Sequence, residues 1–74
     1  MKQHWYFIQK DEFDHWKREI GKTHEVVESV DKLQNQGTLS IVTPEGNIPV
    51  LRKCEHYYGT SYYKNTEVIG DVEL

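Results

Sequence analysis

The tripeptide Pro44-Glu45-Gly46 is the feature that most restricts how this chain folds, because it separates two short runs of strand-forming residues. One run covers residues 39–43 and the other covers residues 47–51. Proline at the second turn position, and glycine where a left-handed residue is needed, suit a type I turn closed by a bulge. The pattern therefore predicts a β-hairpin.

A second hairpin follows if Gly59-Thr60 forms a two-residue turn. That turn would bring opposite charges and apolar side chains into register, which stabilises antiparallel strands. The predicted pairs are Tyr57 with Tyr62, Glu55 with Lys64, Arg52 with Glu67, Leu51 with Val68, and Val50 with Ile69. We therefore expect a three-stranded antiparallel meander over residues 38–69. Within it, Pro49 lacks the N–H that a sheet needs, which predicts an edge or a bulge there.

The N-terminal region predicts a strand. Residues 4–9 are rich in aromatic and β-branched types. Alternation puts Trp5 and Phe7 on one face and Tyr6 and Ile8 on the other. Because both faces are apolar, we expect the strand to be covered or one face to meet a partner.

A helix is predicted next, from Asp11, which can cap it, to Gly21, which ends it. Its apolar stripe at helical spacing consists of Phe13, Trp16 and Ile20. Asp14 and Arg18 are spaced to pair on its surface. In so small a domain we expect both tryptophans in the core.

Residues 24–35 fit either a helix or a strand. In a helix, one stripe would hold Val26, Val27, Val30 and Leu33, and Gly37 would stop it. In a strand, two charged residues would share a face with Val26 and Val30, which is poorer patterning. Three valines lower the helix propensity. The helix is favoured, and the strand is the alternative.

The predicted fold class is α+β, in one small domain spanning residues 1–74. It has a small antiparallel sheet, made of the three-stranded C-terminal meander plus an N-terminal strand, with one or two short helices packed on one face. A chain of this length buries only about 60–65% of the surface that it exposes when unfolded. Such a core is too thin to surround a small molecule.

The composition restricts the cellular compartments and the classes of partner that suit this chain. The single cysteine, Cys54, excludes an internal disulfide framework, and the apolar stretch near the start is far shorter than a signal-peptide core or a membrane span. We therefore expect a cytoplasmic protein without a membrane partner. The net charge of −3 argues against duplex nucleic acid, because duplex binders carry a basic footprint.

Cys54 and His56 lie two apart on a predicted strand and so share a face. A thiol beside an imidazole is a candidate nucleophile–base pair, or half of a zinc site. No second cysteine or regularly spaced histidine accompanies them. We interpret the pair as a half-buried thiol beside a surface histidine, and expect no catalytic residue, metal or cofactor.

Four tyrosines gather around the second predicted turn, two on each face. They are Tyr57, Tyr58, Tyr62 and Tyr63. Tyrosine supplies large, stiff, amphipathic contact area and is favoured at interfaces, whereas ordinary cross-strand pairing is the alternative explanation. With His56 and Arg52 beside them, they are the predicted partner-binding residues.

The functional prediction is a non-enzymatic, intracellular protein-binding module: an adaptor, regulator or inhibitor of the kind carried by phages and mobile elements. It would use an aromatic sheet edge and the tyrosine-rich hairpin. The alternative is a single-stranded nucleic-acid-binding domain whose aromatic side chains stack on bases. A homodimer is a further alternative, because the first strand has apolar groups on both faces that a second copy can bury.

Overall fold

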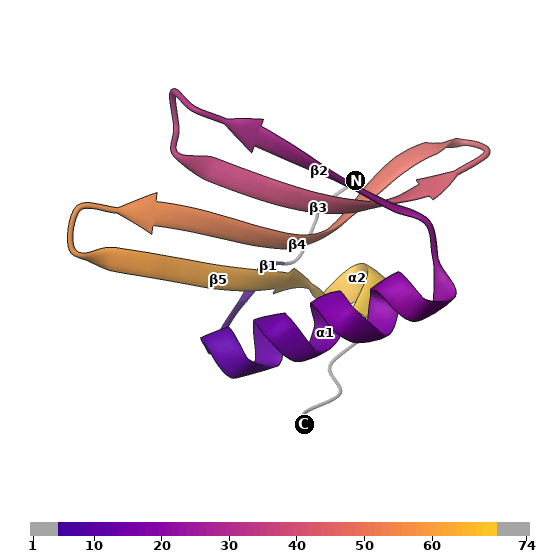
Figure 1. The fold of residues 1–74 in the computed structure, drawn as a ribbon, viewed down its shortest axis with the longest axis horizontal. Helices are drawn as coiled ribbons and strands as arrows, with labels where there is room; N and C mark the ends of the chain where they lie inside the picture. The colour runs from indigo at the N-terminus through magenta and orange to yellow at the C-terminus, as the bar shows by residue number, and fades with distance from the viewer. Residues whose placement is uncertain (1–4, 70–74) are drawn as a thin grey trace.

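The computed structural model describes residues 5–69, which form an antiparallel sheet and two helices (Figure 1). The elements are β1 (Trp5–Ile8), α1 (Lys10–Thr23), β2 (Val26–Asp31), β3 (Gln36–Thr43), β4 (Gly46–His56), β5 (Gly59–Asn65) and α2 (Thr66–Ile69). The strands lie in the order β1-β5-β4-β3-β2. The α+β class is confirmed, but the sheet has five strands instead of the four predicted.

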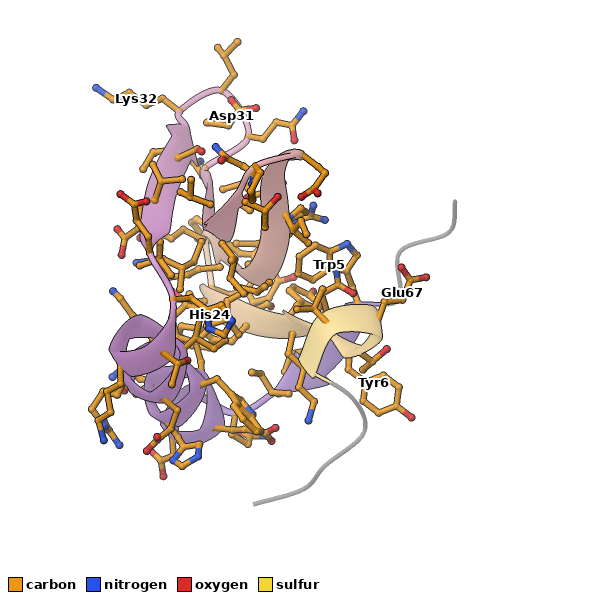
Figure 2. The ribbon with its side chains drawn as sticks, turned by 90° about the vertical axis from the view of Figure 1, so that its right-hand side faces the viewer. Trp5, Tyr6, His24, Asp31, Lys32 and Glu67 are labelled. Atoms are coloured by element: carbon orange, nitrogen blue, oxygen red, sulfur yellow. The ribbon has the colours of Figure 1, made fainter. Side chains whose placement is uncertain are left out.

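The two helices lie on opposite sides of the sheet. α1 runs along β5 on one side (Figure 1), whereas α2 lies on the other side (Figure 2). β1 and β2 are separated in sequence by α1 alone, yet they form the two outer edges. The segment after α1 therefore carries the chain to the far edge, where the carbonyl of Glu25 accepts a hydrogen bond from the N–H of Val42 at 2.9 Å.

The core lies between α1 and the sheet. Its buried side chains are Ile8, Ile20, Leu39, Ile41, Val50 and Leu51, and the partly buried Phe13, Trp16, Val26 and Tyr62 pack against them. The apolar stripe predicted for α1 is therefore confirmed. Both tryptophans are half-buried; Trp16 packs against this core as expected, whereas Trp5 is not among the residues that do.

The predicted ends of α1 were wrong by two residues each. The helix begins at Lys10, with Gln9 in place of Asp11 as the N-cap, and it continues past Gly21 to Thr23. Gly21 does not stop it, because nothing there requires a left-handed conformation and glycine in a helix costs only about 1 kcal/mol. Asp14 pairs with Lys10 at 3.0 Å, and not with Arg18 as predicted.

The favoured helix over residues 24–35 was also wrong, because Val26–Asp31 is the strand β2. Its valines pair with β3, where Val26 lies opposite Ile41. The carboxylate of Asp31 accepts hydrogen bonds from two N–H groups of the turn that follows, and Asn35 closes that turn with a φ of 51°. The β-branched residues and this turn chemistry outweighed the helical spacing.

The first hairpin is confirmed. Thr43 and Gly46 pair across the turn that holds Pro44 and Glu45, and Gly46 has a φ of 129°, which disfavours any residue with a Cβ. Pro49 lies at a register shift opposite the step from Leu39 to Ser40, so the predicted irregularity at Pro49 is a bulge.

The second hairpin forms, but with a different turn and register. Tyr57 and Tyr58 make the turn, so that His56 lies opposite Gly59. The register is displaced by four residues: Leu51 meets Lys64 instead of Val68, Arg52 meets Tyr63 instead of Glu67, and Glu55 meets Thr60 instead of Lys64. Because four is an even number, the slip leaves each side chain on its predicted face.

Asn65 explains why β5 stops where it does. Its side chain is buried and donates a hydrogen bond to the carbonyl of Pro49 at 2.9 Å. Its side-chain oxygen accepts the N–H of Glu67 at 3.0 Å, which caps the first turn of α2. The chain therefore leaves the sheet at Asn65, and Val68 and Ile69 lie in α2 and not in the predicted strand.

An ion pair ties α1 to the sheet. The ammonium of Lys64, whose side chain is only 4% exposed, donates to Glu12 Oε2 at 2.7 Å. The Trp16 indole donates to the same oxygen at 3.0 Å. The hydrogen bond from Lys64 holds the pKa of Glu12 below its ordinary value of 4.5; burial opposes this shift and the Trp16 bond adds to it.

We expect Glu12→Gln to destabilise the fold by about 1.5–3 kcal/mol at neutral pH, because it weakens charged hydrogen bonds to the carboxylate. The folded-state pKa is lowered, so the wild-type advantage is full above pH 4.5 and is lost as the pH falls through the folded value. Urea unfolding of both proteins over a pH series measures the difference. A gap that stays constant on acidification would contradict this role for the carboxylate.

We expect Asn65→Ala to lower the free energy of unfolding by about 1–3 kcal/mol, because it leaves the carbonyl of Pro49 and the N–H of Glu67 without their partner. Asn47→Ala is the matched control, since Asn47 is exposed and such positions change stability by less than about 0.5 kcal/mol. Thermal unfolding followed by circular dichroism compares the two. Equal losses would show that Asn65 does not join the hairpin to α2.

Candidate functional site

Alternation along β5 gives the sheet two different faces. Tyr62 points toward α1, where its ring lies 4.9 Å from that of Phe13, and Lys64 follows it to Glu12. Tyr63, between them, points to the other side. We call the side opposite α1 the open face; Trp5 and α2 lie on it (Figure 2).

Aromatic rings gather at the β1 end of the open face. Phe7 and Tyr63 are cross-strand partners, and their rings meet edge to face at 5.8 Å. Phe7 is 60% exposed although it lies in a strand. Arg52 is the partner of Tyr63 on β4, and its guanidinium carbon lies 4.1 Å from the centre of the Trp5 ring. The geometry is that of a cation–π contact.

The same face continues along β4 to the tyrosine turn. Arg52, Cys54 and His56 alternate onto it, and the His56 ring stacks on Tyr58 with centroids 5.3 Å apart and planes within 6° of parallel. Tyr57 and Tyr58 are 104% and 85% exposed. We call the set on this face the aromatic strip; it consists of Trp5, Phe7, Tyr63, Arg52, His56 and Tyr58.

The structure brings most of the predicted partner-binding residues together. Arg52, His56, Tyr58 and Tyr63 all belong to the aromatic strip, and Tyr57 projects from the turn beside them. Tyr62 does not belong to it, because it packs against α1.

Trp5 and Phe7 are the strip residues that sequence reasoning missed. Alternation had put them on one face, and that was the available signal. Only the pairing of β1 with β5 shows that this face is the one without α1. Their membership in the strip therefore follows from tertiary structure.

Charge is sparse among the strand residues of the open face, and α2 adds Glu67 on the same side (Figure 2). Among the strand residues that the structure describes, alternation places only Arg52 and Asp31 there as charged side chains. The Nε atom of Arg52 is buried and has no hydrogen-bond partner within residues 5–69. A buried N–H without a partner costs about 1–3 kcal/mol, so Arg52 is held in the fold with part of its donor capacity unsatisfied.

Cys54 and His56 share the open face, as predicted, but they lie within ordinary strand pairing. Cys54 is half-buried opposite Ser61 and Gln36. In the part of the chain that the structure describes, no three metal-ligating side chains come together.

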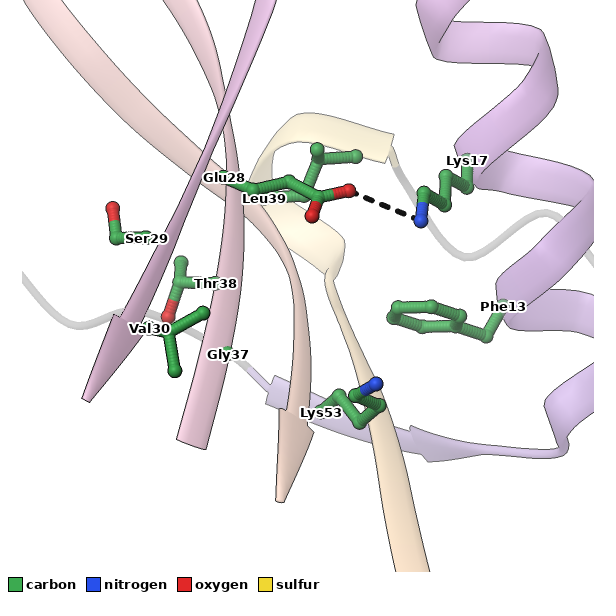
Figure 3. Close-up of a pocket in the computed structure, with 9 residues that line it drawn as sticks. All are labelled: Phe13, Lys17, Glu28, Ser29, Val30, Gly37, Thr38, Leu39 and Lys53. Carbon is green, nitrogen blue, oxygen red and sulfur yellow. Dashed lines mark ion pairs between the residues drawn. The ribbon is translucent and has the colours of Figure 1, made fainter. Parts of the chain in front are cut away.

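A small hollow lies on the α1 side, where Phe13 and Lys17 of α1 face β2 and β3 (Figure 3). Leu39 and Val30 lie among its apolar lining residues, and an ion pair of 3.0 Å between Lys17 and Glu28 closes one side. Its volume is about 90 Å³, whereas ligand pockets occupy about 300–1,000 Å³. It can take a single side chain but not a cofactor.

Comparison with models of known protein families, with curated proteins and with solved structures gave no match for this chain. Neither described helix has the length and apolar character needed to cross a membrane.

Proposed function

We propose that this chain is a non-enzymatic protein-binding module, acting in the cytoplasm as an adaptor, regulator or inhibitor, and that the aromatic strip is its contact surface. The observation that carries the proposal is the exposure of the strip rings of Phe7 and Tyr58, together with that of Tyr57 in the adjoining turn. Burying an aromatic or large aliphatic side chain is worth about 1.5–3 kcal/mol, which a partner would recover at each ring.

The character of the strip also supports the proposal. Aromatic residues and arginine are enriched at the centres of protein interfaces, and most other charged residues are depleted there. The strip has five rings and one cation, and they are held by strand pairing and ring contacts. Such pre-organised side chains lose little rotamer entropy when a partner binds.

Single-stranded nucleic acid is the second candidate, favoured by the contact of Arg52 with Trp5 beside Phe7 and Tyr63 on one sheet face. Base stacking on such rings is a common mode of single-strand recognition. It ranks lower because most of its affinity comes from several cations that contact phosphates, whereas this strip has one and the chain carries a net charge of −3.

The test compares capture from a lysate of the source organism by wild type, by Phe7→Ser with Tyr58→Ser, and by Leu33→Ser. Leu33 is 97% exposed in the β2–β3 turn and is the control for loss of an exposed apolar side chain. We expect one protein to bind wild type and the control, and to bind the double variant at least about tenfold more weakly. Circular dichroism checks that each protein is folded.

Two results would contradict the proposal. One is equal capture by wild type and the double variant, which would put the contact surface elsewhere. The other is quenching of tryptophan fluorescence by a single-stranded oligonucleotide at low salt, lost in the double variant and on addition of salt, which would favour the second candidate.

A further inference from the structure

We infer that Arg52 is the anchor of the aromatic strip and that it binds one carboxylate, from an aspartate or glutamate that the partner presents next to an apolar side chain. This inference rests on the proposed function and names the chemistry of the partner.

Arg52 belongs to the central strand of the sheet. It lies on β4, with Tyr63 of β5 on one side and Thr38 of β3 on the other. Both neighbours are half-buried and β4 is the central strand, so Arg52 starts from the middle of the sheet, and its guanidinium reaches Trp5 of β1. Charged contacts at the centre of an interface are desolvated and strong, whereas contacts at the rim contribute little.

The guanidinium of Arg52 lies over an aromatic ring. The Trp5 ring lies against it at 4.1 Å, and its Nε atom is buried without a hydrogen-bond partner among residues 5–69. All five N–H donors of arginine lie in the guanidinium plane. A ring contact on the guanidinium face leaves the in-plane donors to the side, and a carboxylate, which accepts two parallel N–H bonds, fits the two terminal Nη groups beyond the buried Nε.

The surroundings of Arg52 favour a single carboxylate beside an apolar side chain as its partner group. The nearest strip rings, Phe7 and Tyr63, offer an apolar surface beside the cation. A polyanion needs more cations than this face holds, and Asp31 on the same face would repel it. The net charge of −3 likewise disfavours an acidic tract. One carboxylate flanked by an apolar residue satisfies the cation and covers the rings.

The experiment selects peptides from a random display library on the immobilised full chain and, in parallel, on Arg52→Gln. We expect wild type to enrich peptides with one acidic residue beside an aromatic or aliphatic one, and Arg52→Gln to lose that preference. For the best peptide, Arg52→Gln should weaken binding at least about tenfold, and so should glutamine in place of the acidic residue. The two changes together should cost little more than either alone.

Arg52→Lys is the matched variant, because it keeps the charge but loses the planar donors, and it should bind with intermediate affinity. Selected peptides without an acidic preference, or with equal affinity for wild type and Arg52→Gln, would overturn the inference. So would recovery of no peptide, or displacement of the peptide by a single-stranded oligonucleotide.

A separate measurement tests the proposed function: binding of the selected peptides to the double variant Phe7→Ser with Tyr58→Ser. Peptides that bind the double variant more weakly than wild type, but bind Arg52→Gln equally well, would support the protein-binding strip and overturn the carboxylate anchor alone. Peptides with the same affinity for wild type, the double variant and Arg52→Gln would overturn both the proposed function and the carboxylate anchor. The Trp5 and Trp16 fluorescence spectrum and circular dichroism confirm that each variant is folded.

Discussion

One helix lies against a sheet that is wider than the helix, and the rest of the structure follows from this mismatch. A helix is about 10–12 Å across with its side chains, whereas five strands spaced about 4.8 Å apart span about 19 Å. α1 runs along β5 and so covers part of one face, and the four residues of α2 cover little of the other. The ion pair between Lys64 and Glu12 fixes which part is covered.

The consequence concerns the aromatic residues. Tyr62, Phe13 and Trp16 pack between α1 and the sheet. Phe7 and Tyr63 are side by side on the face without α1, and Tyr58 extends that surface through its contact with His56. The same mismatch leaves the hollow beside Phe13 and Val30 on the α1 side. Exposed rings on the open face are thus a product of topology and not of a loose core.

Local residue patterns predicted the elements that local chemistry determines. The apolar stripe of α1 and the turn at Pro44-Glu45-Gly46 are examples. β2 was missed because Glu28 lies among the valines on the face of β2 toward α1. Its ion-pair partner there, Lys17, is distant in sequence. The second register was missed because it depends on Asn65 capping α2 and binding Pro49.

The predicted site residues depend less on the strand register than on the face to which each side chain points. An even slip preserves faces, so Arg52, His56 and Tyr63 share one side in both the predicted and the observed pairing. Tyr62 lies on the other side, against Phe13, and sequence alone did not show which face α1 covers. Trp5 and Phe7 were left out for the same reason, although their alternation was read correctly.

The most direct test of this account is photochemically induced nuclear polarisation, an NMR measurement that enhances the signals of tyrosine rings that a dye in solution can reach. Single Tyr→Phe variants assign the signals. The account predicts strong enhancement of Tyr57 and Tyr58 and little enhancement of Tyr62, which α1 covers. Enhancement of Tyr62 equal to that of Tyr57, or silent Tyr57 and Tyr58, would contradict the division of the sheet into a covered and an open face.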